Sequence, residues 1–380
     1  MQIVANPFKF GKEVKGCQFY DRTDAFETLY RKLAGGSANV VMYAPRRYGK
    51  TSLVRKVLDR FLAEDVPTVY FDFSKIESIE RFCEEYASAL YAVTGKAQRA
   101  LQRIADYLQH LHPTLSLGGD APVSIRFDYG VRMNATSLSS VLDLAEKIAV
   151  EELGRPIVVA FDEFQDIDAL SSEIPLEAVF RSCIQAHQNV RYVFLGSKTH
   201  LMKRMFSDKA RPFYKSAATI RLAKPPEAES VAFVKERFAS VAIEIADDLA
   251  ARIVSEAANV PYYVQQLSAL TFDVVAASGR VEVTSADVDA GIAAVLDENA
   301  DYYVTLFGTC SPTQKRLVAA LAREPAAEFT EDYRRRHVLG SPSTVHSALK
   351  AVVEAGLVES DATGHAIGDP FFARYIRASA

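Results

Sequence analysis

The chain has 380 residues, which is longer than one ordinary domain and favours two or three. Hydrophobic residues make up 49% of it and charged residues 24%, the composition of a well-packed soluble protein. The formal net charge of −4 and the pI near 6.0 exclude a global attraction to nucleic acid or to an anionic membrane. Any nucleic-acid surface must therefore be a local patch.

We expect a cytoplasmic protein without a membrane span. The N-terminus lacks the basic start and apolar stretch of a signal peptide, and no run reaches about 18 apolar residues without a charge. The cysteines lie far apart, without a CxxC pair or a nearby histidine at ligand spacing, which argues against zinc. Reduced, mostly buried thiols are the simpler interpretation. They are Cys17, Cys83, Cys183 and Cys310.

Short apolar runs alternate with longer helical patterns from residue 39 to about 225. Continuous apolar strands separated by helices predict a parallel sheet that is covered on both faces, which is an α/β core. The segment 115–132 breaks the alternation, and we interpret it as a hairpin or a mobile insertion. The predicted strands are 39–44, 68–73, 156–161, 191–195 and 218–222.

The rest of the chain predicts two smaller domains. Lys224-Pro225-Pro226 ends the sheet region, because neither proline can extend a central strand. The sequence then looks purely helical to about residue 299, which we interpret as a lid on the core. Three helices and two short strands follow, as in a winged helix-turn-helix. We therefore expect an α/β core over 1–225, a helical lid over 226–300 and a winged helix domain over 301–380.

The segment between the first predicted strand and the next helix has the pattern of a P-loop. A triphosphate needs several backbone N–H donors and the positive end of a helix, and Gly49 lets the backbone approach. We expect Lys50 to supply charge between the β- and γ-phosphates and the Thr51 hydroxyl to ligate Mg²⁺. The predicted phosphate-binding residues are Ala44, Pro45, Arg46, Arg47, Tyr48, Gly49, Lys50, Thr51 and Ser52.

Two features of this loop leave alternatives open. The P-loop pattern G-x-x-x-x-G-K-[ST] has glycine where this chain has Ala44. If the backbone there needs a positive φ, alanine costs on the order of 1 kcal/mol; if only a small side chain is needed, alanine is tolerated. Arg46 and Arg47 either contact phosphate or a partner, or they form salt bridges.

An acidic pair follows the third predicted strand. Asp162 and Glu163 come directly after four buried apolar positions, at the sheet edge where ligands bind in open α/β folds. We expect Asp162 to hold Mg²⁺ through its water shell and Glu163 to polarise the attacking water. A carboxylate pair alone is often a solvated helix cap, but a P-loop about 110 residues upstream makes chance improbable.

Further catalytic candidates follow the fourth predicted strand. Ser197 either senses the γ-phosphate or caps the following helix. Arg211 and Lys215 lie in a loop that follows. One interpretation is that either cation stabilises transition-state charge, in its own subunit or in a neighbouring one. The other is that both face solvent.

Several further motifs complete a family resemblance, and they are spread over most of the chain. They are Asn6-Pro7-Phe8, Phe19-Tyr20-Asp21-Arg22, Pro45 through Ser52, Phe161 through Gln165, and Pro261-Tyr262-Tyr263. The chain resembles the archaeal-type P-loop ATPases of the AAA+/STAND group. The resemblance implies ATP with Mg²⁺ as cofactors, a helical lid and a C-terminal winged helix. It also implies adenine contacts from Phe8, Phe19, Arg22, Pro261 and Tyr262.

The C-terminal module leaves its partner open. Residues 341–350 have the small polar start of a recognition helix, and 334–337 supply a basic patch. Lys350 is the only lysine or arginine on that helix, and nearby acidic residues nearly balance the module. We therefore expect contact with duplex DNA through residues 334–350 or contact with a protein.

The motifs together predict a slow ATPase that acts as a molecular switch, moving the winged helix with its nucleotide state. One alternative is a homo-oligomeric AAA+ motor that remodels DNA or protein with a neighbour's arginine. The other is a nucleotide-sensing transcriptional regulator with little hydrolysis.

Overall fold

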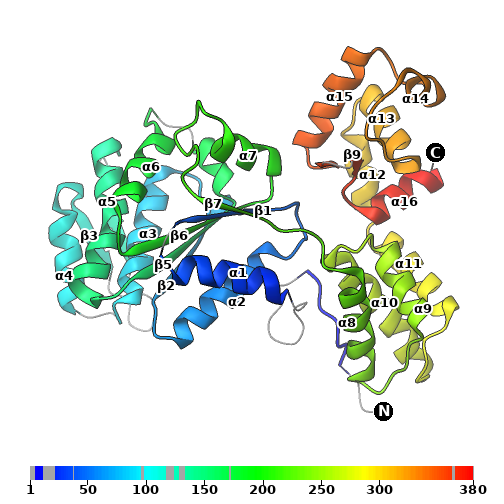
Figure 1. Cartoon of the computed structure of the whole chain (residues 1–380), viewed down its shortest axis with the longest axis horizontal. Helices are drawn as coiled ribbons and strands as arrows, with labels where there is room; N and C mark the ends of the chain where they lie inside the picture. The colour runs from blue at the N-terminus through cyan, green and yellow to red at the C-terminus, as the bar shows by residue number, and fades with distance from the viewer. Residues whose placement is uncertain are drawn as a thin grey trace. The chain divides into compact units, whose positions relative to one another are not determined.

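The structure is a computed structural model, and it describes residues 5–11, 22–36, 38–95, 98–116, 124–127, 133–170, 173–361 and 364–379. The described residues fall into two compact units (Figure 1). We call the first the sheet unit; it comprises Arg22–Arg46 and Lys50–Leu222. The second, the helical unit, comprises Arg47–Gly49, the described N-terminal residues and the chain from Ala223 onward.

The sheet unit is built on five parallel strands in the order β2-β5-β6-β1-β7. Each strand coincides with a predicted apolar run, so the prediction of a parallel α/β core is confirmed. The register places Asp72 opposite Asp162 and Tyr43 opposite Gly196, so the carboxyl ends of these four strands lie at one edge. The strands are β1 (Val40–Tyr43), β2 (Thr68–Asp72), β5 (Ile157–Asp162), β6 (Val190–Gly196) and β7 (Ala218–Arg221).

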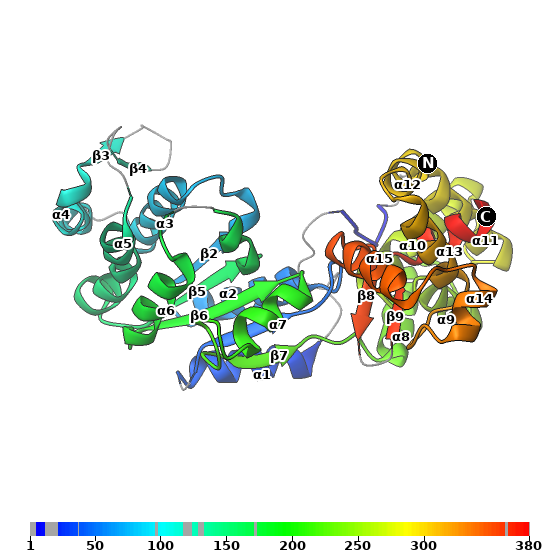
Figure 2. The same cartoon turned by 90° about the horizontal axis from the view of Figure 1, so that it is seen from above.

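Helices cover both faces of this sheet (Figures 1 and 2). One face packs against α1 (Thr23–Ala34) and α2 (Lys50–Ala63). The other face holds a buried aromatic cluster in which Phe161 lies 5.5 Å from Phe73 between ring centroids. Aromatic burial of this kind is a large part of the stability of such a core. The helices on that face are α3 (Ile79–Val93), α5 (Ala135–Lys147), α6 (Leu176–Ala186) and α7 (Thr199–Ser207).

A β-hairpin is inserted between α4 (Gln98–Tyr107) and α5. Its strands, β3 (Pro113–Ser116) and β4 (Ser124–Phe127), pair antiparallel, which confirms the hairpin interpretation for the described part of 115–132. The hairpin docks on α3, where the Ser88 hydroxyl accepts from the Ile125 N–H at 2.9 Å. Glu84 accepts likewise from Phe127 at 3.0 Å. Short irregular helices complete the unit at Phe73–Lys75, Gln109–Leu111, Ile148–Leu153 and Phe164–Ala169.

The helical unit begins with four helices and ends with a helical module that carries a short hairpin (Figure 1). The first four are α8 (Glu227–Ala239), α9 (Asp247–Glu256), α10 (Pro261–Ser278) and α11 (Ser285–Glu298). The module contains α12 (Ala300–Gly308), α13 (Pro312–Arg323), α14 (Glu331–Arg336), α15 (Pro342–Glu354), β8 (Val358–Asp361), β9 (Gly364–Ile367) and α16 (Pro370–Ser379). The sequence did not predict α12, in which Tyr303 is the one buried residue.

The N-terminal segment packs in the helical unit. Phe8 is buried, and its ring centroid lies 4.9 Å from that of Phe238 on α8. The Asn6 side chain donates to the Ala269 carbonyl at 3.0 Å. The Phe8 ring therefore packs in the core of the helical unit, and the Asn6 amide anchors the segment to α10.

Two general features of the chain concern membranes and thiols. No helix in the described part of the chain has the length and apolarity that a membrane crossing requires. Cys83, Cys183 and Cys310 are buried and carry no disulfide, as predicted for them, whereas Cys17 lies outside the described residues.

The start of α11 is stabilised by a carboxylate. Thr284 and Asp287 form a capping box, and Arg280 donates to the same carboxylate at 2.8 Å. The bond from Arg280 and those from Thr284 lower the pKa of Asp287 to about 2, against the opposing effect of burial. A lowered pKa means that Asp287 stabilises the fold fully above its unfolded pKa of about 3.9, and that this gain is lost as the pH falls toward 2.

Asp287→Ala is therefore expected to lower the free energy of unfolding by roughly 1–2 kcal/mol at pH 7. The difference from wild type should shrink as the pH falls from 4 toward 2, as measured by urea denaturation. Asp297→Ala, an exposed position on the same helix, is the control and should cost less than about 0.5 kcal/mol. An equal loss in both variants would contradict the role of the cap.

Candidate functional site

The phosphate-binding loop connects β1 to α2. Arg47 and Gly49 both have positive φ, 69° and 82°, so the loop turns through left-handed conformations at these positions. Ala44 does not have a positive φ and is buried. The position that is glycine in the usual pattern needs only a small side chain here, and alanine is tolerated without backbone strain.

Lys50 is the first residue of α2 and is 5% exposed. Its ammonium donates to the carbonyl oxygens of Ala44 at 2.7 Å and of Pro45 at 2.8 Å. A buried lysine needs such partners, and these two carbonyls hold the side chain folded back over the loop. The charge is thereby kept where phosphate oxygens can replace the carbonyls as acceptors.

Thr51 and Asp162, which are far apart in sequence, are in direct contact. The Thr51 hydroxyl donates to Asp162 Oδ2 at 2.7 Å, and the backbone N–H of Glu163 donates to Oδ1 at 2.8 Å. Asp162 ends β5 and is 4% exposed. A hydroxyl beside a carboxylate is an oxygen donor set that suits Mg²⁺, so these residues fit the metal that the sequence predicted.

Glu163 is held by three donors on one oxygen. Its Oε2 accepts from Gln165 Nε2 at 2.7 Å, from the Ser197 hydroxyl at 2.7 Å and from the Ser197 N–H at 3.0 Å. Burial alone would raise the pKa of Glu163, but these bonds and the charge of Lys50 outweigh it and lower the pKa. The side chain is therefore ionised at neutral pH, which is the form that can take a proton from water.

Ser197 lies at the acidic pair and does not cap the next helix. The N-cap of α7 is Lys198, and the Ser197 hydroxyl is directed to Glu163. This geometry argues against the capping interpretation, and the sensor role of Ser197 stays a prediction. Arg211 is engaged elsewhere: it forms ion pairs with Glu177 and, at 2.8 Å, with Asp168. Its catalytic role stays a prediction.

Sequence reasoning assigned no role to three residues around the acidic pair. Gln165 is 2% exposed and binds Glu163, and Tyr70 on β2 donates its hydroxyl to Asp162. Gly196 leaves the space that Gln165 fills, because a Cβ there would lie 2.3 Å from Gln165 Oε1. The sequence offered one signal for this group, the Gln two residues after Glu163; nothing marked Tyr70.

Three of the predicted nucleotide residues, Arg47, Pro261 and Tyr262, belong to the helical unit. Arg47 donates to Asp369 at 3.0 Å and to the Tyr263 hydroxyl, with its guanidinium 4.9 Å from the Tyr262 ring centroid. Arg47 therefore follows the salt-bridge alternative. Pro261 is the first residue of α10.

The remaining predicted nucleotide residues have varied surroundings. Tyr48 is buried and donates to Glu359 at 3.0 Å, whereas Arg46 is exposed. Arg22 is buried just before α1, and Phe19 lies outside the described residues. The adenine contacts of Phe8, Phe19, Arg22, Pro261 and Tyr262 stay predictions.

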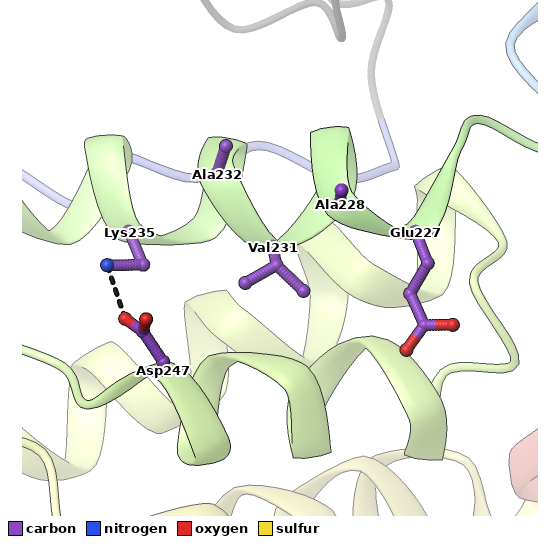
Figure 3. A pocket seen from close by; sticks show the side chains of 6 residues that line it. All are labelled: Glu227, Ala228, Val231, Ala232, Lys235 and Asp247. Atoms are coloured by element: carbon purple, nitrogen blue, oxygen red, sulfur yellow. Dashed lines mark ion pairs between the residues drawn. The ribbon is translucent and has the colours of Figure 1, made fainter.

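A groove of about 580 Å³ lies between α8 and the start of α9 (Figure 3). Its floor is apolar, and the ion pair between Lys235 and Asp247 closes one end. None of the predicted nucleotide or metal residues lines it. The lining residues are Glu227, Ala228, Val231, Ala232, Lys235 and Asp247.

A parallel sheet with a lysine-bearing loop and an acidic strand end at the same edge defines the class of P-loop NTPases. Within that class, the chain belongs to the family of ATPase domains found predominantly in Archaea, whose model matches residues 19–267. Residues 301–378 match the model of a probable winged helix domain. No curated protein matches the sequence.

Solved structures show the same fold at low identity. The Walker-type ATPase PABY2304 of Pyrococcus abyssi is 16% identical, with a TM-score of 0.68 over 98% of this chain and 99% of that one. The Aeropyrum pernix ORC2 protein in its ADPNP–ADP complexes is 13% identical, with a TM-score of 0.54 and 95% of each chain covered. The Aeropyrum pernix ORC1 protein in complex with DNA is 13% identical, with a TM-score of 0.50 over 97% and 94%. At these identities the likeness concerns the fold alone.

Proposed function

We propose that this protein is an ATP-binding and ATP-hydrolysing molecular switch of the AAA+/STAND type, which couples its nucleotide state to the winged helix domain. The contact between the Thr51 hydroxyl and Asp162, at 2.7 Å, carries the proposal. It joins the P-loop helix to the acidic end of β5, and the two residues that it links are the ones predicted to hold the metal. When bound, Mg²⁺ neutralises charge on the phosphate oxygens.

Three side chains have distinct roles in this proposal. Lys50 exchanges the carbonyls of Ala44 and Pro45 for phosphate oxygens, so ATP binding releases the loop's internal bonds. Glu163 is ionised and takes a proton from the attacking water. Ser197 orients that carboxylate through its hydroxyl and its N–H. The proposal also includes slow hydrolysis and the sensing of the γ-phosphate by Ser197.

Calorimetric titration of the chain with ATP tests the metal site. We expect wild type to bind ATP more tightly with Mg²⁺ than with EDTA, and Asp162→Asn to lose most of this difference, because a neutral amide lacks the negative charge with which a carboxylate attracts the cation. Asp59→Asn, at an exposed position on α2, is the control and should behave as wild type. A wild-type affinity for ATP that is the same with Mg²⁺ and with EDTA would refute the proposal.

The partner of the winged helix is either duplex DNA or a protein. All three arginines of α14 are engaged within the module: Arg335 with Asp332 at 3.0 Å, Arg336 with Glu324 at 2.7 Å, and Arg334 with a backbone carbonyl at 2.6 Å. These bonds reduce the charge that is available to phosphates and favour a protein. A similar fold, ORC1 of Aeropyrum pernix, is known in complex with DNA. Duplex DNA binding that weakens with added salt would favour DNA.

The two alternatives make different demands on the chain. A homo-oligomeric motor needs an arginine that reaches a neighbour's nucleotide, whereas Arg211 is paired with Glu177 and Asp168 of its own chain, which favours the switch. A transcriptional regulator with little hydrolysis needs no water-activating carboxylate, so the three-donor clamp on Glu163 argues against it. Size-exclusion chromatography with and without ATP distinguishes a motor from a switch.

A further inference from the structure

Tyr70 lies beside the metal-holding carboxylate on the neighbouring strand. β2 pairs with β5 so that Tyr70 is opposite Ala160 and Asp72 is opposite Asp162. From this position the Tyr70 hydroxyl donates to Asp162 Oδ2, the same oxygen that accepts from the Thr51 hydroxyl at 2.7 Å. Two hydroxyls from two different elements therefore meet on one carboxylate oxygen.

The Tyr70 ring is fixed by more than its strand. The guanidinium carbon of Arg55 lies 3.6 Å from the ring centroid, and Arg55 belongs to α2, the helix that Lys50 begins. A guanidinium stacked on an aromatic face contributes about 0.5–2 kcal/mol and restricts the ring's rotation. The hydroxyl is thus held in place by the sheet on one side and by the P-loop helix on the other.

The bonds to Asp162 are unequally distributed between its two oxygens. An ionised carboxylate offers about four acceptor positions. Oδ2 uses two, for Tyr70 and Thr51, whereas Oδ1 uses one for the N–H of Glu163 at 2.8 Å. Counting the bonds from the described residues, Oδ1 has one position left for a metal ion or its water shell, and the two hydroxyls fix the direction in which it points.

We infer that Tyr70 is a positioning residue for magnesium: its hydroxyl orients the Asp162 carboxylate that holds the ion. This inference rests on the proposed function, since it assumes a magnesium–ATP site at Thr51 and Asp162. In this role Tyr70 acts through its hydrogen bond to Asp162. Removing a hydrogen-bond partner of a metal ligand typically lowers metal affinity by about 10- to 100-fold.

Tyr70→Phe tests the inference, because it keeps the ring and its stacking on Arg55 while deleting the hydroxyl. ATP affinity is measured by calorimetry over a range of Mg²⁺ concentrations and in EDTA. We expect the half-saturating Mg²⁺ concentration to rise about tenfold, with the affinity for ATP in EDTA unchanged. Circular dichroism confirms that the variant is folded.

The matched control is Tyr107→Phe. Tyr107 also donates its hydroxyl to a carboxylate of the sheet unit, Glu151, away from the metal-site residues. This variant should keep the magnesium response of wild type. An unchanged response in Tyr70→Phe would overturn the inference. So would an equal loss of affinity with and without Mg²⁺, because Tyr70 would then support the loop and not the carboxylate. If the affinity of the wild type for ATP does not depend on Mg²⁺, the proposed function and this inference are both refuted.

Discussion

Glu163→Gln is expected to leave ATP binding intact and to lower ATP turnover at least about 100-fold. The amide oxygen of glutamine can occupy the position of Oε2 and accept from Gln165 and Ser197, so the local structure is retained. The amide cannot take a proton from water at neutral pH, so the chemical step loses its base. Turnover is measured by phosphate release at saturating Mg²⁺ and ATP, and binding by calorimetry.

The control for this variant is Glu173→Gln, which makes the same chemical change at an exposed position of the sheet unit. It should retain the turnover and the affinity of wild type. If Glu163→Gln hydrolyses ATP at the wild-type rate, another group activates the water and our assignment is wrong. If it fails to bind ATP, the carboxylate has a structural role in the nucleotide site.

The strands and the two ends of the site could be predicted because local sequence determines them. A strand buried on both faces needs a continuous apolar run, and 157–161 has one directly before Asp162. Lys50 and Thr51 follow β1 in the same way. Since parallel strands end at one edge, the two groups were expected at the same edge of the sheet, and the Thr51 hydroxyl does contact Asp162 there.

The residues that were missed depend on which strand lies beside which. Nothing in the sequence states that β2 is next to β5, so Tyr70 looked like one more aromatic of a buried strand. Gln165 lies in a short 3₁₀ helix whose direction follows from the left-handed backbone of Glu163. Whether the P-loop tolerates alanine at position 44 could not be predicted either, because the answer depends on the φ angle of that residue, which the sequence does not give.

Gly196→Ala is expected to damage the site without touching any predicted site residue. The added Cβ would lie 2.3 Å from Gln165 Oε1 and 2.3 Å from Met202 Cγ, far inside van der Waals contact. Both neighbours are side chains, so they can move, at a cost of about 1–3 kcal/mol in the free energy of unfolding. Movement of Gln165 withdraws a donor from Glu163, and a misplaced base lowers turnover by roughly 10- to 100-fold.

Urea denaturation and phosphate release measure the two effects on the same sample. Gly308→Ala is the control, because a Cβ at that helical position meets nothing within 4 Å. It should leave turnover unchanged and should not lower the free energy of unfolding, since alanine is favoured over glycine in a helix. A double variant with Gln165→Ala separates the causes, since it removes the side chain with which the methyl collides. If the collision with Gln165 causes the loss of stability, Gly196→Ala lowers the free energy of unfolding less in the Gln165→Ala background than in wild type. Equal losses in the two backgrounds would mean that the collision with Met202 is the cause and that Gly196 does not confine Gln165.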